Sequence, residues 1–173
     1  MPISLHTATV GTYLQILPSI AALINKAEEH CHANSLTPDE LTMARLAEDM
    51  WPFAKQIFEC GHHSARAIES VRAGVFRPEL EPAPMEFAAL HQEIADAIAF
   101  LETVKPDELN SMAEYDVRFE FRDMRIDFTV ENFLLTFSLP NFYFHAVTAY
   151  DILRNQGLPL GKLDYLGRPR AKG

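Results

Sequence analysis

Four long stretches of the chain place their apolar residues at the three- and four-residue spacing of a helix that is buried on one side. The stretches are residues 4–31, 52–72, 87–101 and 130–155. Each such helix must bury its apolar stripe against another element, so the pattern predicts long helices packed around a common core. A length of 173 residues suits one such domain. We therefore predict a single all-α domain over residues 1–173, a four-helix bundle.

Local signals indicate where the helices begin, end and bend. Residues 37–40, Thr-Pro-Asp-Glu, combine a capping box with proline at the first helical position, so a short helix should begin there. Gly74 and Gly157 should end the second and the fourth long helix. Pro18 and Pro140 lack the backbone N–H that a helix interior needs, so each predicts a kink.

Between the third and the fourth stretch the pattern changes to alternation. In residues 117–121 and 125–128 every second residue is apolar, which is typical of β-strands. These segments predict a small β-hairpin that turns near Asp123 and is inserted before the last helix. Thr129 can cap that helix.

Composition excludes several classes of protein. The 15 Lys and Arg against 24 Asp and Glu leave a net charge of −9, which argues against a general nucleic-acid binder. Cys31 and Cys60 are too few for a disulfide framework. Residues 2–25 and 132–150 lack Asp, Glu, Lys and Arg, but their central prolines and polar groups would be tolerated badly in lipid. We expect a soluble, cytoplasmic protein that binds neither nucleic acid nor membrane.

Polar residues on the second helix border its apolar face. A helical wheel places Asp49, Gln56 and His63 along one line at that border. His62 and Glu59 fall on the polar face, so His62 should point to solvent. Asp49 can also be explained as a cap at the helix start. Gln56 and His63 either find local hydrogen bonds or point together into the interior.

The fourth helix carries Asn141 and His145 at i, i+4 inside a nearly apolar run. A buried histidine must be hydrogen-bonded, paired or bound to a metal. One reading is a satisfied core histidine. The other is that His145 and His63 project from two helices into one polar cavity and bind a divalent zinc, nickel or iron ion. Trp51 is interpreted as a packing residue at the helix entry.

Several sequence blocks resemble the DinB/YfiT-like superfamily of metal-dependent bundle proteins, and the chain is most similar to an uncharacterised bacterial branch of it. The blocks are residues 45–52 (Arg-Leu-Ala-Glu-Asp-Met-Trp-Pro) with Gln56, residues 62–64 (His-His-Ser), residues 139–145 (Leu-Pro-Asn-Phe-Tyr-Phe-His), residues 148–154, residues 157–162 and residues 164–167. The resemblance spans most of the chain. It implies the same four-helix bundle that the periodicity predicts.

The resemblance also implies a metal site that this chain only partly matches. Metal-binding members of the superfamily use one histidine on the second helix and an i, i+4 pair on the last. His63 and His145 match two of these positions, whereas Asn141 and Ala149 stand where the second histidine of the pair would be. Asp49 or a water could complete the set.

Two functions follow as hypotheses. The first is a small metal-dependent transferase or hydrolase, with thiol transfer as the most concrete version because some relatives use low-molecular-weight thiols. The second is a metal-free binding or structural bundle with a buried polar network or ligand pocket. Its members would be Asp49, Gln56, Asn141, His145 and Tyr150.

The composition also bears on assembly. The chain has 12 phenylalanines and long apolar helices, which suggests more apolar surface than one chain buries. A two-fold homodimer is the commonest way to cover such surface. A well-filled core is the alternative, and the superfamily resemblance favours the dimer.

Overall fold

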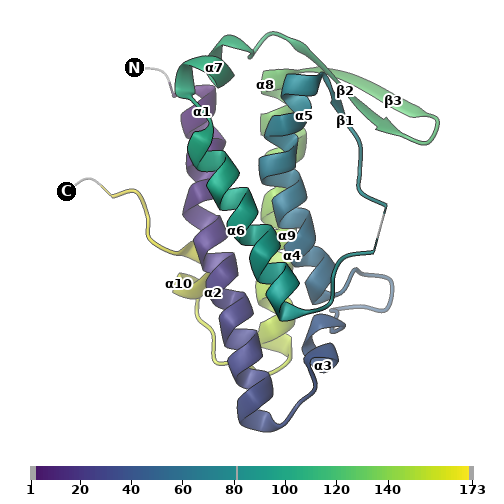
Figure 1. Cartoon of the computed structure of the whole chain (residues 1–173), viewed down its shortest axis with the longest axis vertical. Helices are drawn as coiled ribbons and strands as arrows, with labels where there is room; N and C mark the ends of the chain where they lie inside the picture. The colour runs from purple at the N-terminus through teal and green to yellow at the C-terminus, as the bar shows by residue number, and fades with distance from the viewer. Residues whose placement is uncertain (1–2, 81, 172–173) are drawn as a thin grey trace.

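The computed structural model describes residues 3–80 and 82–171, which fold into a mostly helical domain with a small sheet at one end (Figure 1). The described helices are α1 (Leu5–Ala8), α2 (Val10–Asn34), α3 (Pro38–Thr42), α4 (Phe53–Gly61), α5 (Ala67–Ala73), α6 (Phe87–Thr103), α7 (Pro106–Ser111), α8 (Val130–Asn132), α9 (Leu139–Asn155) and α10 (Lys162–Leu166). Two segments are π-helical: η1 (His62–Arg66) and η2 (Phe133–Ser138). The strands are β1 (Val75–Phe76), β2 (Asp116–Phe121) and β3 (Met124–Thr129).

The long helices lie alongside one another (Figure 1). α2 packs on α6, while α4 packs on both α6 and α9. Their facing sides form one continuous apolar core, in which the largest fully buried side chains include Tyr13, Phe53, Phe133 and Phe142. The apolar spacing read from the sequence therefore corresponds to the buried stripe of each helix.

The predicted boundaries agree closely with the structure. The side chain of Glu40 accepts a hydrogen bond from the Thr37 backbone N–H at 2.7 Å, which completes the capping box of α3. Gly74 ends α5 in the left-handed region at φ 74°. The Thr129 side chain caps α8. The helix runs through Pro18 without a break, and α1 and α2 are separated at Thr9 instead.

The predicted hairpin is confirmed, but the sheet has a further strand. β2 pairs antiparallel with β3 in the register Phe121–Met124 to Asp116–Thr129. β1 pairs parallel with β2, which places Phe76 beside Phe119. β1 directly follows the helix-ending Gly74 and has two residues. A strand this short shows no alternation in the sequence, so β1 was missed. Helices α7 and α10 were not predicted either.

The two π-helical segments, η1 and η2, lie next to each other in the fold. The Ser138 hydroxyl at the end of η2 donates to the carbonyl oxygen of His63 in η1 at 2.8 Å. The Tyr13 hydroxyl donates in turn to Ser138 at 3.4 Å. A π-helical turn contains one more residue than an α-turn and is often found at functional sites. Here both insertions lie where the second and fourth long helices face each other.

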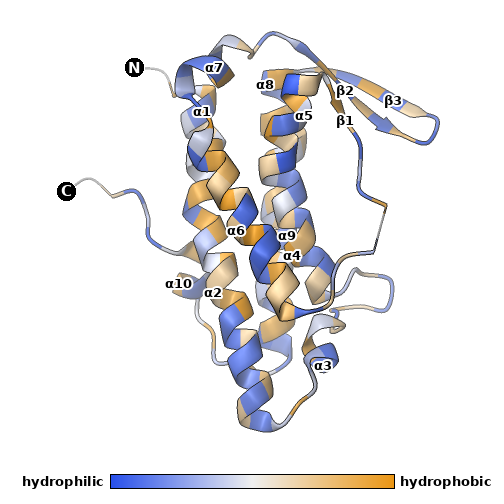
Figure 2. Cartoon of the chain, in the orientation of Figure 1, coloured by the Kyte–Doolittle hydropathy of each residue, from blue (hydrophilic) through white to orange (hydrophobic). Residues whose placement is uncertain are grey.

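One described helical stretch, Leu5–Asn34, is long and apolar enough to cross a membrane by length and composition. Half of its most apolar window is buried inside the protein. Polar residues interrupt the apolar ones along α2, and the end of the helix near α3 is mostly hydrophilic (Figure 2). A core helix passes the same test as a membrane span, and the buried contacts of α2 with α6 identify it as a core helix here.

Candidate metal centre

Three buried side chains meet between the second and the fourth long helix: Glu59 from α4, His63 from η1 and His145 from α9. Each offers one ligand atom, and these atoms lie within 4.8 Å of one another. The residues are only 4%, 7% and 4% exposed. Two imidazoles and a carboxylate are a ligand set that proteins use for zinc and for non-haem iron.

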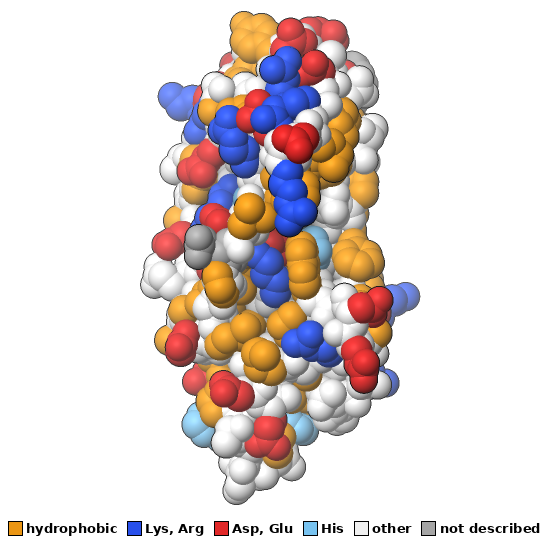
Figure 3. Space-filling view, turned by 90° about the vertical axis from the view of Figure 1, so that its right-hand side faces the viewer, with side chains coloured by type: hydrophobic (Ala, Val, Ile, Leu, Met, Phe, Trp, Pro, Cys, Tyr) orange, Lys and Arg blue, Asp and Glu red, His pale blue; other side chains and the backbone are white. Residues whose placement is uncertain are grey.

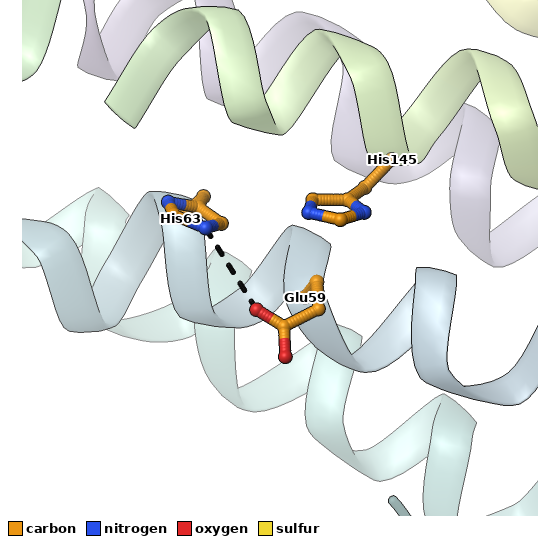
Figure 4. Close-up of side chains that lie close together, drawn as sticks. All are labelled: Glu59, His63 and His145. Carbon is orange, nitrogen blue, oxygen red and sulfur yellow. Dashed lines mark ion pairs between the residues drawn. The ribbon is translucent and has the colours of Figure 1, made fainter. Parts of the chain in front are cut away.

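The three side chains face a common space (Figure 4). The rings of His63 and His145 are stacked, with centroids 5.6 Å apart and planes at 16°. The Nε2 of His63 lies 3.8 Å from a carboxylate oxygen of Glu59, which is too long for a hydrogen bond. Two atoms that bind one zinc ion at about 2.0–2.2 Å lie roughly 3–4 Å apart. The His63–Glu59 separation of 3.8 Å lies in that range, and ligand atoms up to 4.8 Å apart would move closer together around an ion.

A hydrogen bond determines the tautomer of His145. The Gln56 amide nitrogen donates to the Trp51 carbonyl oxygen at 3.0 Å, which orients the amide group. The Gln56 oxygen therefore faces the Nδ1 of His145 at 2.7 Å and can only accept. Nδ1 must carry the hydrogen, so Nε2 keeps a free lone pair. Metal-ligating histidines are commonly oriented by such a bond from their other nitrogen.

The electrostatics keep both imidazoles neutral at neutral pH. Burial, with repulsion from His145 and His62, lowers the pKa of His63 to about 2. Burial, with repulsion from Lys55 and His62, lowers the pKa of His145 to about 4. Metal binding requires deprotonated ligands, so these two rings are in the protonation state that a metal needs.

Glu59 differs because it has a cationic partner. Burial raises the pKa of its carboxyl group, and Lys55 opposes that shift through an ion pair of 2.8 Å. A carboxylate in this position is a hard, anionic ligand, whereas an unpaired buried carboxyl would take up a proton. Lys55 thus helps to keep Glu59 available for a cation.

The donor chemistry therefore fits a divalent metal ion. The His63 nitrogen that faces Glu59 is Nε2, at 3.8 Å, while the buried Nδ1 makes no hydrogen bond among the described residues. Hydrogen bonding within the protein therefore does not explain this imidazole. Ligand atoms of His145 and Glu59 lie within 4.8 Å of each other and of a His63 nitrogen. A buried Glu/His/His group that could hold a metal is thus present.

The structure brings His63, His145 and Gln56 together, as the sequence analysis predicted. Asn141 lines the same cavity as His63 and His145, whereas Asp49 and Tyr150 lie farther out. Asp49 is exposed in the turn before α4 and lies at the rim of a shallow pocket with Gln56 and His145. Asn141 is half-buried, and its amide donates to the carbonyl of Phe137 in its own helix at 2.7 Å. Tyr150 packs on Tyr165, with ring centroids 6.3 Å apart.

The prediction for His62 was wrong. His62 is 5% exposed, and its ring packs on Phe76 with centroids 4.7 Å apart. The wheel assumed a regular helix whose polar face meets water. The π-helical turn changes the direction of the residues that follow Gly61, and β1 covers this side of the helix with Phe76. A replacement of His62 should therefore affect stability.

Two further site residues were missed or misread. Glu59 was assigned to the solvent face, although its i, i+4 spacing from His63 is the spacing at which two helical side chains can share one ligand. That spacing was the signal available in the sequence. Trp51 is half exposed, and its ring is stacked on His145 with centroids 5.7 Å apart. It forms part of the site wall instead of the helix packing alone.

The comparisons with known proteins agree with this architecture. A family model described as a domain of unknown function, DUF1993, matches residues 5–166. The chain belongs to the DUF1993 family. A crystal structure of a DinB family member protein from Shewanella denitrificans is similar, with a TM-score of 0.81 and 26% sequence identity over 98% of this chain and 95% of that chain. This DUF1993 protein is therefore DinB-like, as the sequence blocks suggested. No curated protein matches it.

Replacement of Gln56 by leucine should weaken metal binding by about 10- to 100-fold without removing a ligand. The variant removes the acceptor that orients His145 and sets its tautomer, and losses of this size are typical when such an outer partner is removed. Zinc titration by calorimetry measures the change. Gln15→Leu, on α2 outside this site, is the control, and an equal affinity for Gln56→Leu and the parent protein would contradict the assigned role.

Proposed function

We propose that this DUF1993 protein is a small metal-dependent enzyme whose single divalent ion is held by Glu59, His63 and His145. The convergence of these three buried side chains within 4.8 Å carries the proposal. Zinc suits the two imidazoles and one carboxylate, and iron or nickel are the other candidates. The third ligand in this set is Glu59 of α4. It replaces the second histidine of the last helix that the superfamily resemblance led us to expect.

We infer a transferase or hydrolase, with thiol transfer as the most concrete version. A divalent ion at this position would supply Lewis acidity and favour the ionised form of a bound water or thiol. The protein's own groups have separate tasks. Gln56 orients His145, Lys55 maintains the charge of Glu59, and Trp51 shields one face of the His145 ring from water.

Metal content of untagged protein, purified without chelator and measured by mass spectrometry, tests the proposal. We expect close to one zinc, iron or nickel per chain, and a loss of at least about 100-fold in affinity for Glu59→Gln because the anionic ligand is removed. Glu93→Gln is the matched control, since Glu93 is also a partly buried, ion-paired glutamate, with Arg66 at 3.0 Å, but lies outside the group. No binding of zinc, iron or nickel after incubation with each would refute the proposal.

A metal-free binding protein is the second candidate, favoured by the direct hydrogen bond between Gln56 and His145. Of the five residues we expected in its polar network, Gln56 and His145 bond directly to each other. Asn141 and Asp49 line the adjoining cavities, and Tyr150 packs on Tyr165. In this alternative the bond at 2.7 Å satisfies a core histidine, and the neighbouring cavity takes an organic ligand. A parent protein that is stably folded without metal and takes up none would support this second candidate.

We also propose that the protein forms the homodimer and has the cytoplasmic location that the sequence analysis expected. Several large apolar side chains are exposed among the described residues, including Ile3, Leu46 and Leu163, and their cover by a second chain would remove apolar surface from water. Light scattering measures the mass in solution, and fractionation of cells locates the protein.

A further inference from the structure

The metal group opens into a cavity of about 380 Å³ whose walls are largely aromatic. Its polar lining consists of Glu59, His63, His145, Asn141 and Glu79. Six aromatic side chains make up most of the apolar lining: Trp51, Phe76, Phe119, Phe121, Phe137 and Phe144. They come from four separate parts of the chain, namely the turn before α4, the sheet, η2 and α9. Ligand sites commonly combine a mainly apolar cavity with a few polar groups at one place.

The sheet supplies much of the aromatic wall of this cavity. β1 and β2 bring Phe76 and Phe119 together, with ring centroids 6.2 Å apart. Phe119 also packs on Phe137 at 5.2 Å, so the sheet is attached to η2 through aromatic contacts. Pro78 and Leu80, from the segment after β1, line the outer edge. The sheet therefore gives the site a hydrophobic wall in addition to closing the end of the helices.

The surface around the opening has the same character. On this face, hydrophobic side chains surround a partly visible histidine, and Lys and Arg side chains gather toward the end that carries the hairpin (Figure 3). Three arginines of β2, β3 and the segment after β1 have acidic partners: Arg77 and Arg125 contact Glu120 at 2.6 and 3.3 Å, and Arg118 contacts Asp127 at 2.6 Å. Such paired arginines leave little net positive charge for a polyanion. The opening thus favours a small molecule with a largely apolar body over a polyanion.

We propose that this cavity binds a small molecule with an aromatic body and one anionic donor group, and that the donor group reaches the Glu59, His63 and His145 cluster. The proposal rests on the proposed function, because a divalent ion adds two positive charges to a cavity whose two carboxylates already face cations. Lys55 pairs with Glu59 at 2.8 Å and Arg66 with Glu79 at 3.8 Å, so the ion leaves an excess of positive charge for an anionic donor. An apolar cavity of about 150 Å³ binds benzene, so the volume here accommodates one or two rings. An aromatic thiolate is one ligand of this class.

The test compares acetohydroxamate with benzohydroxamate, which share one anionic chelating group and differ in the ring. Calorimetry on protein with measured zinc content should show benzohydroxamate binding at least about tenfold more tightly, because only its ring enters the aromatic cavity. In Phe144→Ala this preference should fall about fivefold while zinc affinity stays unchanged. Phe144 is 55% exposed, so the variant keeps the core intact.

Tyr143→Ala is the matched control. Tyr143 is the neighbouring exposed aromatic residue on α9, 38% exposed, and is not among the residues that line the cavity. Equal affinities for the two hydroxamates in zinc-loaded protein would overturn the inference and leave the metal site standing. An equal loss in Tyr143→Ala and Phe144→Ala would also overturn it.

A second experiment, on metal-free protein, tests the cavity independently of the metal site. The fluorescent probe 1-anilinonaphthalene-8-sulfonate has an aromatic body and one anionic group, and we expect it to bind the metal-free protein and to bind Phe144→Ala about fivefold more weakly. If zinc does not bind, the proposed function fails and this experiment alone decides about the cavity. Probe binding that is absent, or equal in Phe144→Ala and the parent protein, would then refute the cavity proposal.

Discussion

The free energy of unfolding of the metal-free protein is expected to fall by about 2 kcal/mol per pH unit between roughly pH 6 and pH 4. Three buried histidines cause this loss. Burial lowers the pKa of His62 and of His145 to about 4 and that of His63 to about 2, whereas each ring has a pKa near 6.5 in the unfolded chain. In this window the unfolded chain binds protons that the folded protein excludes, so stability is present at neutral pH and lost on acidification.

The size of this slope depends on two opposing effects: the histidines of the folded protein exclude protons, and two of its carboxyl groups take them up. Each excluded proton contributes about 1.4 kcal/mol per pH unit, so three histidines set an upper limit of about 4. Glu59 and Glu93 act in the other direction, because burial raises the pKa of both carboxyl groups and the folded protein then binds protons earlier than the unfolded chain. The net slope therefore lies below this limit.

Urea unfolding at several pH values, with a chelator present, measures this slope. His62→Leu should reduce it by about 1 kcal/mol per pH unit, since one of the three titrating groups is lost and the leucine keeps an apolar contact with Phe76. His32→Leu is the matched control because His32 is exposed, and its slope should equal that of the parent. An unfolding free energy that stays constant from pH 6.5 to pH 4.5 would show that the histidines are not buried in neutral form.

Replacement of His145 by alanine should lower the free energy of unfolding at pH 7 by about 2–4 kcal/mol, even without metal. The variant leaves a cavity between α4 and α9. It also leaves the Gln56 oxygen, now paired at 2.7 Å, without its donor in a buried position. The stacked ring of Trp51 loses its partner as well. Chemical denaturation of the metal-free protein gives the change directly.

The same variant should also lose its metal. The stability of the metal-free protein tests the packing role of His145, and the metal content tests its role as a ligand. His32→Ala is the control, and as a surface substitution it should stay within about 0.5 kcal/mol of the parent. A change below that limit for His145→Ala would mean that the ring is not part of the packed interior. A stable variant that still binds one zinc per chain would remove His145 from the ligand set.

Much of the architecture could be predicted because its signals are local. Helix spacing, the capping box at Thr37 and the helix-ending Gly74 depend on residues within one or two turns, and the structure confirms them. The hairpin was visible for the same reason, since alternation needs only a few residues of each strand. β1 was missed because two residues carry no pattern, and its pairing with β2 joins segments about 43 positions apart, as Val75 and Arg118 show.

The site was only half predictable. His63, His145 and Gln56 stood out because polar residues inside an apolar pattern are conspicuous. Glu59 and His62 were assigned to solvent because a helical wheel assumes a regular α-helix and a water-filled space outside it. Neither assumption holds here, since η1 changes the turn and Phe76 of β1 covers that side.

The amino-acid sequence by itself determined the long helices, their caps, the hairpin and two of the three candidate metal ligands, because each follows from short-range spacing along the chain. The tertiary structure decided which faces are buried. The packing of α4 against α9, the two π-helical turns and the strand β1 bring Glu59 next to His63 and His145 and surround them with aromatic side chains. The pairing of β1 with β2 joins residues 43 positions apart, and the bond between Gln56 and His145 joins residues 89 apart. No local pattern encodes contacts of that range.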